Sequence, residues 1–98
     1  MSKIFDPQFS KIERAMEIAA RMQEVISHNI ANAKTPGYVP LTFDEQLMQA
    51  KKRLDRREVV LEEELAALTQ NSVKYSAYVK ILSSKMNVLR NIATQGRR

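Results

Sequence analysis

A heptad repeat runs through residues 61–93, LEEELAALTQNSVKYSAYVKILSSKMNVLRNIA. Its core positions alternate in steps of four and three, and they are Leu61, Leu65, Leu68, Ser72, Tyr75, Val79, Leu82, Met86, Leu89 and Ala93. This spacing is typical of a coiled-coil seam. The acidic residues 62–64 at its start and Arg90 near its end complement the helix dipole. We therefore predict one long helix over about residues 61–95.

Polar residues interrupt this seam at 71–75, NSVKY. A buried polar residue in a seam can fix register and partner choice, and the alternative is a locally exposed segment. A weaker second stripe through Tyr78, Ile81, Lys85, Val88 and Ile92 suggests a second neighbour for the helix. We predict an assembly seam made by Leu65, Leu68, Asn71, Tyr75, Val79, Leu82, Met86 and Leu89.

A second amphipathic helix is predicted over about residues 7–33. Asp6 and Pro7 suit the N-cap and first helical positions. Apolar residues then recur with a period near 3.6, at Phe9, Ile12, Met16, Ala19, Met22, Ile26, Ile30 and Ala33. The helix is expected to end before Thr35-Pro36-Gly37-Tyr38, where Pro36 disfavours helix and Gly37 suits the positive φ of a type II turn. Asn29 and Asn32 precede this turn, and we expect their amides to tie it to the helix end, with fraying as the alternative.

Residues 34–60 are predicted as a turn and connector. Thr42-Phe43-Asp44-Glu45 matches a capping box and could open a short helix to about Leu54. The run 51–57, KKRLDRR, has five basic residues in seven, and we interpret it as a solvated hinge. The fold class is thus predicted as all-α, a coiled-coil-like hairpin of two long helices in one domain, residues 1–98.

Composition excludes several classes of function. The 98 residues contain no Cys and one His, which removes disulfide frameworks, cysteine nucleophiles and histidine-cluster metal sites. His28 and Glu24 stand four residues apart, but two ligands without a third make a weak metal site. We therefore predict no catalytic, cofactor-binding or metal-binding residues, and no enzyme activity. The sequence also has no apolar run long enough to cross a bilayer and no N-terminal apolar segment of a cleaved signal peptide.

The distribution of charge leaves open the alternative of a protein that binds nucleic acid. Residues 1–50 sum to −1 and residues 51–98 to +6, so the +5 net charge lies in the second half. A basic helical protein that binds nucleic acid would show this balance, although the basic run lacks the interleaved aromatics of such proteins. A helical chaperone or adaptor is a further alternative. Two helices alone leave much apolar surface exposed, which instead favours a hairpin that completes its core by assembly with other chains.

Two segments resemble a known family. Residues 27–38, SHNIANAKTPGY, resemble the N-terminal signature of flagellar axial proteins, with its Asn-Ile-Ala-Asn core and Thr-Pro-Gly-Tyr turn. Residues 60–65, 71–75 and 82–85, together with Leu89, are similar to the C-terminal segment of flagellar rod proteins. The family usually has a longer middle than residues 39–59, and the basic run has no clear counterpart in it.

The resemblance implies a structural subunit of the basal body rod. Its terminal helices would pack into the tubular drive shaft that transmits torque and surrounds the export channel. The expected partners are other rod proteins, basal-body ring and adaptor proteins and the flagellar export apparatus, with no nucleic acid and no membrane insertion. The expected location is the periplasmic rod, reached by type III export without a cleaved signal peptide.

Overall fold

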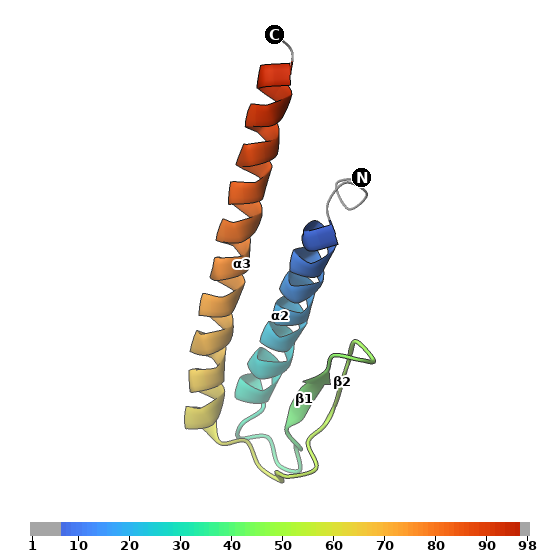
Figure 1. The fold of residues 1–98 in the computed structure, drawn as a ribbon. Coiled ribbons are helices and arrows are strands. Elements are labelled where there is room, and N and C mark those ends of the chain that lie inside the picture. Colours follow the sequence, from blue (N-terminus) through green and yellow to red (C-terminus); the bar gives the residue numbers. More distant parts are fainter. Residues whose placement is uncertain (1–6, 97–98) are drawn as a thin grey trace.

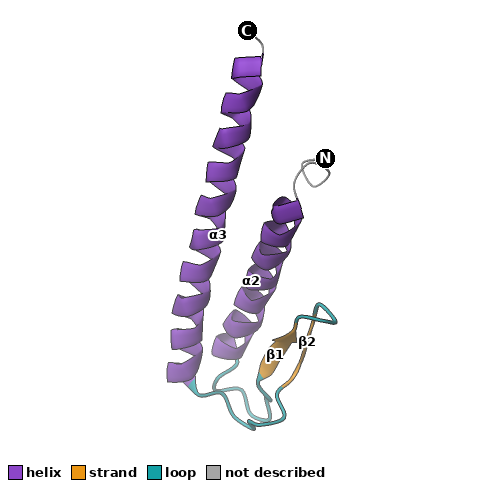
Figure 2. Ribbon diagram, viewed as in Figure 1, coloured by secondary structure: helices purple, strands orange, loops and turns teal. Residues whose placement is uncertain are grey.

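The computed structural model describes residues 7–96, which form two antiparallel helices and a small β-hairpin (Figures 1 and 2). Helix α2 spans Pro7–Ala31, strands β1 and β2 span Leu41–Asp44 and Gln49–Lys52, and helix α3 spans Leu61–Gly96. Helix α2 contacts both α3 and β1. The molecule measures 65 × 24 × 16 Å, so it is thin and encloses little core. No helix within residues 7–96 is both long and apolar enough to cross a membrane.

Helix α2 buries three residues of the predicted apolar stripe, Phe9, Ala19 and Ile26, and also Val25, which the predicted stripe did not include. Asn29 is buried with them near the helix end. The helix begins at Pro7 as predicted; the proposed cap Asp6 lies outside the described residues. It ends at Ala31 rather than about residue 33, because the Asn32 and Ala33 amides already take part in a tighter turn of backbone hydrogen bonds to residues 28–30.

The predicted short helix after Thr42 is wrong, and the fold is therefore not purely α-helical. This segment forms an antiparallel hairpin in which Leu41 pairs with Lys52 and Asp44 with Gln49. Asp44, not Thr42, supplies the cap: its Oδ1 accepts hydrogen bonds from the backbone amides of Gln46 and Leu47. Those two bonds, that from Leu47 first, lower the pKa of Asp44 below its ordinary value. The carboxylate therefore stabilises the hairpin above the unfolded pKa, and this contribution is lost as pH falls through the lower, folded pKa.

Met48 is the last residue of the hairpin turn and has a φ of +53°. A side chain in this left-handed conformation costs about 1–2 kcal/mol, and glycine avoids the cost. We expect Met48→Gly to stabilise the hairpin by about 1 kcal/mol, measured by the amide exchange of residues 41–52. An unchanged or faster exchange in this variant would show that the Met48 side chain stabilises the turn by more than its conformation costs.

Helix α3 exceeds α2 by eleven residues, since it has 36 and α2 has 25. At about 1.5 Å per residue, the C-terminal part of α3 extends ~16 Å beyond the start of α2. Figure 1 shows this end of α3 standing free of the other described elements. Large apolar side chains are exposed along α3; they are Leu61, Leu65, Val73, Tyr75, Val79, Ile81, Met86, Val88, Leu89 and Ile92. One partner helix therefore covers only part of its apolar surface.

Candidate functional site

Asn29 is the centre of a buried hydrogen-bond network at the end of α2. Its side chain is 1% exposed. Its Nδ2 donates to the carbonyl oxygen of Leu41 at 2.9 Å and to Oε1 of Glu64 at 3.3 Å. Its Oδ1 accepts from the Leu41 amide at 2.9 Å and from the Tyr38 hydroxyl at 2.6 Å. One amide thus joins α2 to the segment after the turn and to the start of α3.

Tyr38 and His28 extend this network to the surface. The Tyr38 hydroxyl has one proton, which it donates to Asn29, so the 2.8 Å contact with His28 requires Nδ1 of His28 to donate to the phenol oxygen. The rings lie 5.4 Å apart at a tilt of 43°. Desolvation, and then the nearby Glu64 carboxylate, raise the pKa of Tyr38, which keeps the phenol protonated as the donor. His28 is therefore a partner of Tyr38, and within residues 7–96 no three potential metal ligands gather.

Glu64 and Arg53 complete the network. The sequence does not predict this role for either residue. Glu64 is 6% exposed, whereas the sequence indicates only that it belongs to the acidic start of the helix. Its Oε1 lies 3.9 Å from an Arg53 guanidinium nitrogen, and Arg53 also forms a two-point contact with Asp55. The backbone amide of Arg53 donates to the Pro40 carbonyl at 2.8 Å. Arg53 therefore holds the end of the hairpin against the helix pair rather than standing in a solvated hinge.

Polar residues of α3 at multiples of seven residues make its side-chain hydrogen bonds to α2. Glu64 accepts from Asn29, and Lys85 donates to Gln8 and lies 5.9 Å from the Phe9 ring centroid. Between them, Asn71 is 4% exposed and donates to the Ala19 carbonyl at 2.7 Å and to Gln23 at 2.9 Å. Together with the half-buried Tyr78 they form a column, which we call the polar column: Glu64, Asn71, Tyr78 and Lys85. The heptad spacing of these polar residues was the signal that could have predicted this face.

The predicted assembly seam contains both residues that are covered by α2 and residues that are exposed. Asn71 is buried against α2, and Leu68 and Leu82 are half-buried. The other members lie between 38% and 46% exposed; they are Leu65, Tyr75, Val79, Met86 and Leu89. Leu65, Val79 and Met86 each follow a member of the polar column by one residue, so they flank the contact with α2.

The turn after α2 has the geometry that its sequence suggests. The Tyr38 amide donates to the Thr35 carbonyl at 3.2 Å across Pro36 and Gly37. Gly37 has a φ of +77°, which a type II turn requires at this position. Asn32 supports the turn from outside the buried network: its Nδ2 donates to the His28 carbonyl, and its Oδ1 accepts from the Thr35 hydroxyl.

Substitutions at Gly37 are expected to act through the backbone alone. A Cβ atom added to Gly37 meets nothing within 4 Å, so the cost is conformational. We expect Gly37→Val to destabilise the turn by about 1–2 kcal/mol and Gly37→Asn by less, because asparagine tolerates positive φ. Amide exchange of Tyr38 measures both changes. An equal effect of the two variants would point to a lost contact rather than to the conformation.

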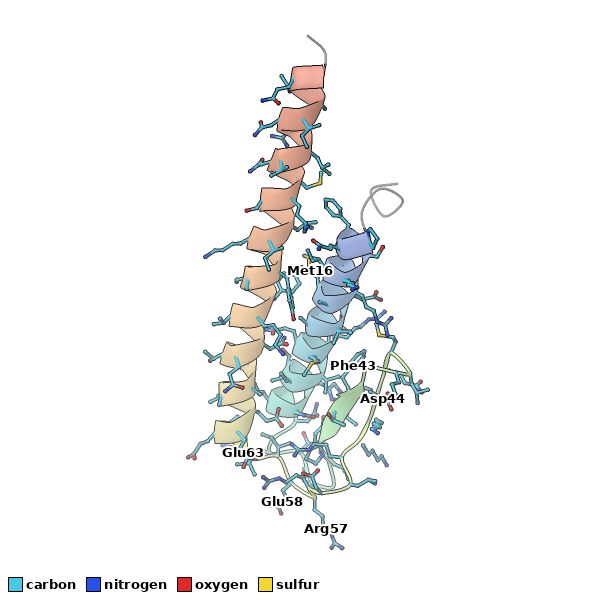
Figure 3. All side chains as sticks on the ribbon, viewed as in Figure 1. Met16, Phe43, Asp44, Arg57, Glu58 and Glu63 are labelled. Carbon is cyan, nitrogen blue, oxygen red and sulfur yellow. The ribbon has the colours of Figure 1, made fainter. Side chains whose placement is uncertain are left out.

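Three of the five basic residues in the run 51–57 form ion pairs inside the chain. Lys51 lies 3.5 Å from Asp44, Arg53 pairs with Asp55, and Arg56 lies 2.9 Å from Glu63. Figure 3 shows Glu63, Glu58 and Arg57 at the end of the molecule where α3 begins. These internal pairs give the charges a structural explanation that needs no nucleic acid.

Comparison with known proteins relates both the motif and the whole chain to one family. Residues 13–38 match the model of the family described as flagella basal body rod protein, a range that contains Asn29, Asn32 and the turn. Flagellar basal body rod protein FlgB of Bacillus subtilis is 25% identical, in an alignment of 127 positions that covers 96% of this chain and 98% of the relative. An alignment of that length must include residues of the relative that this 98-residue chain lacks. The two matches together support the assignment of this chain to the flagellar basal body rod proteins, as an FlgB-like member.

Proposed function

We propose that this chain is a structural subunit of the flagellar basal body rod. The observation that carries the proposal is the exposed apolar surface of α3 on both sides of its contact with α2. Leu65, Val79 and Met86 lie on one side, and Ile81 and Val88 lie on the other. Large apolar side chains exposed in this number along one helix are typical of a protein that packs against partners, and a tubular assembly would supply helices on both sides.

A groove between the helices supports the same proposal. A hollow of about 360 Å³ lies between α2 and α3 and is lined by small side chains that include Ala19, Ala20, Ser72 and Ser76. Small residues allow another helix to approach closely. Asn71 Oδ1 is buried nearby with no hydrogen-bond partner in residues 7–96, so a neighbour that contributes a donor would satisfy it.

The network around Asn29 has a structural role in this function. It fixes the direction in which α3 leaves the hairpin, and therefore where the exposed surface of α3 is presented. The proposed partners are other rod proteins and the ring and adaptor proteins of the basal body, with delivery through the export apparatus. The proposed location is the periplasmic rod.

Deletion of the gene tests the proposal. We expect the deletion strain to lack assembled rods and swimming, and the wild-type gene to restore both. Electron microscopy of isolated basal bodies and a motility assay measure these outcomes. Intact rods in the deletion strain would contradict the proposal. Retention of the purified protein on DNA at physiological salt would instead favour the nucleic-acid alternative.

A further inference from the structure

The β-hairpin has an open edge that the helix pair does not use. Strand β1 lies against α2, whereas all four residues of β2 are exposed. The sheet has two strands, so no third strand lies beyond β2 within residues 7–96. The outward backbone groups of β2 are therefore available for pairing with an added strand. Figure 1 shows β2 on the side of the hairpin away from α3.

Side chains along this edge combine positive charge with exposed leucines. Lys51 and Lys52 occupy the strand; Lys51 lies 3.5 Å from Asp44, and Lys52 makes no ion pair with the residues that the structure describes. Leu47 is 63% exposed at the turn, and Leu54 is fully exposed just beyond the strand. A hollow of about 390 Å³ lies at this end and is lined in part by Lys51, Lys52 and Leu54. The edge thus has a basic centre and an apolar residue at each end.

The conformation of the turn supports a binding role for this edge. Met48 has a positive φ, a conformation in which glycine or asparagine would be less strained. Residues in strained backbone conformations persist where the surrounding structure holds them, and they are common at functional sites. The turn therefore keeps two adjacent apolar side chains, Leu47 and Met48, next to the basic strand.

Charge determines the kind of partner. A second copy that paired through the same edge would place lysines opposite or diagonal to lysines, which is destabilising. The acidic residues Glu62 and Glu63 of a second copy lie in the first turn of α3, whose helical backbone is not extended and cannot pair as a strand. We propose that the outer edge of β2 binds an extended, acidic segment of another protein by strand addition, with its apolar residues against Leu47 and Leu54.

A synthetic peptide tests this proposal on the full chain. The probe alternates glutamate and valine, has leucine at each end, and is about eight residues long, the number that matches residues 47–54. We expect saturable binding, with changes in NMR chemical shift confined to residues 46–54. A peptide with lysine in place of glutamate should bind about tenfold more weakly, and so should the glutamate peptide with N-methylated amides along one edge. The N-methyl groups remove strand pairing and leave the side chains unchanged.

Two double variants with equal charge change provide the controls. Lys51→Glu with Lys52→Glu should weaken the acidic peptide about tenfold and bind the lysine peptide better. Lys74→Glu with Lys80→Glu, on the exposed surface of α3, should change neither affinity. The proposal is overturned if the acidic peptide does not bind, if the N-methylated peptide binds equally well, or if both double variants lose affinity equally. It is also overturned if only vesicles of anionic phosphatidylglycerol bind the edge.

Discussion

Asn29→Leu is expected to separate the segment after the turn from the helix pair. The substitution keeps a side chain of similar size but leaves the amide and carbonyl of Leu41, the Glu64 carboxylate and the Tyr38 hydroxyl without their shared partner. Each buried polar group left unsatisfied costs about 1–3 kcal/mol, so the total loss should be about 3 kcal/mol or more. Hydrogen exchange of the Leu41 amide, which donates to Oδ1 of Asn29 in the native state, measures this loss directly.

Asn32→Leu is the matched control for this prediction. Asn32 belongs to the same motif, but its hydrogen bonds to His28 and Thr35 are exposed. Exposed bonds exchange readily with water, so the variant should lose less than about 1 kcal/mol and leave Leu41 protected. Similar exchange of the Leu41 amide in both variants would show that the network does not depend on Asn29.

Met86→Asp is expected to abolish incorporation into the rod and to leave the isolated chain as helical as before. Met86 is 45% exposed in the predicted assembly seam, so aspartate there remains hydrated in the free chain. Against a neighbouring helix, the same carboxylate would be desolvated without a partner, which is far more costly than the loss of an apolar contact. Circular dichroism of the free protein and the content of isolated basal bodies measure the two halves of the prediction.

Val73→Asp is the control that tests whether loss of incorporation is specific to the seam or follows from changing any exposed apolar residue. Val73 is 66% exposed on the same helix but lies outside both the seam and the polar column. The two variants introduce the same residue into the same helix, and Met86→Asp lowers helix propensity by only ~0.3 kcal/mol more, because methionine is a better helix former than valine. We expect Val73→Asp to be incorporated. Incorporation of both variants, or of neither, would contradict the placement of the assembly surface along the seam.

The sequence predicted the two helices and the turn because their signals are local. Pro7 at the start of α2, the period of its apolar residues, and Pro36-Gly37 act within a few residues of chain. The hairpin was not predicted because it depends on pairing between distant residues, such as the Arg53 amide and the Pro40 carbonyl. Thr42 and Glu45 fit a helix start equally well from sequence alone, and the long-range contacts decide between the two structures.

Only the part of the candidate site that is local in sequence could be predicted. Asn29 and Tyr38 stand near each other in the chain, whereas Glu64 reaches Asn29 across 35 residues. The heptad pattern indicated a packing stripe on α3, but an apolar period cannot show which of two adjacent columns faces the partner. In the structure the polar column, which includes Asn71, makes the hydrogen bonds to α2, and Leu65, Val79 and Met86 flank that contact.

Assembly is expected to cover the exposed seam of α3, and cysteine labelling tests this most directly. The chain has no cysteine, so Met86→Cys and Val73→Cys each introduce a single reactive thiol. Maleimide labelling is then compared between the free protein and basal bodies isolated with the variant incorporated. We predict that the thiol at 86 reacts in the free protein and is protected in the basal body, while the thiol at 73 is protected less. Equal labelling at 86 in the free and the assembled protein would contradict the account.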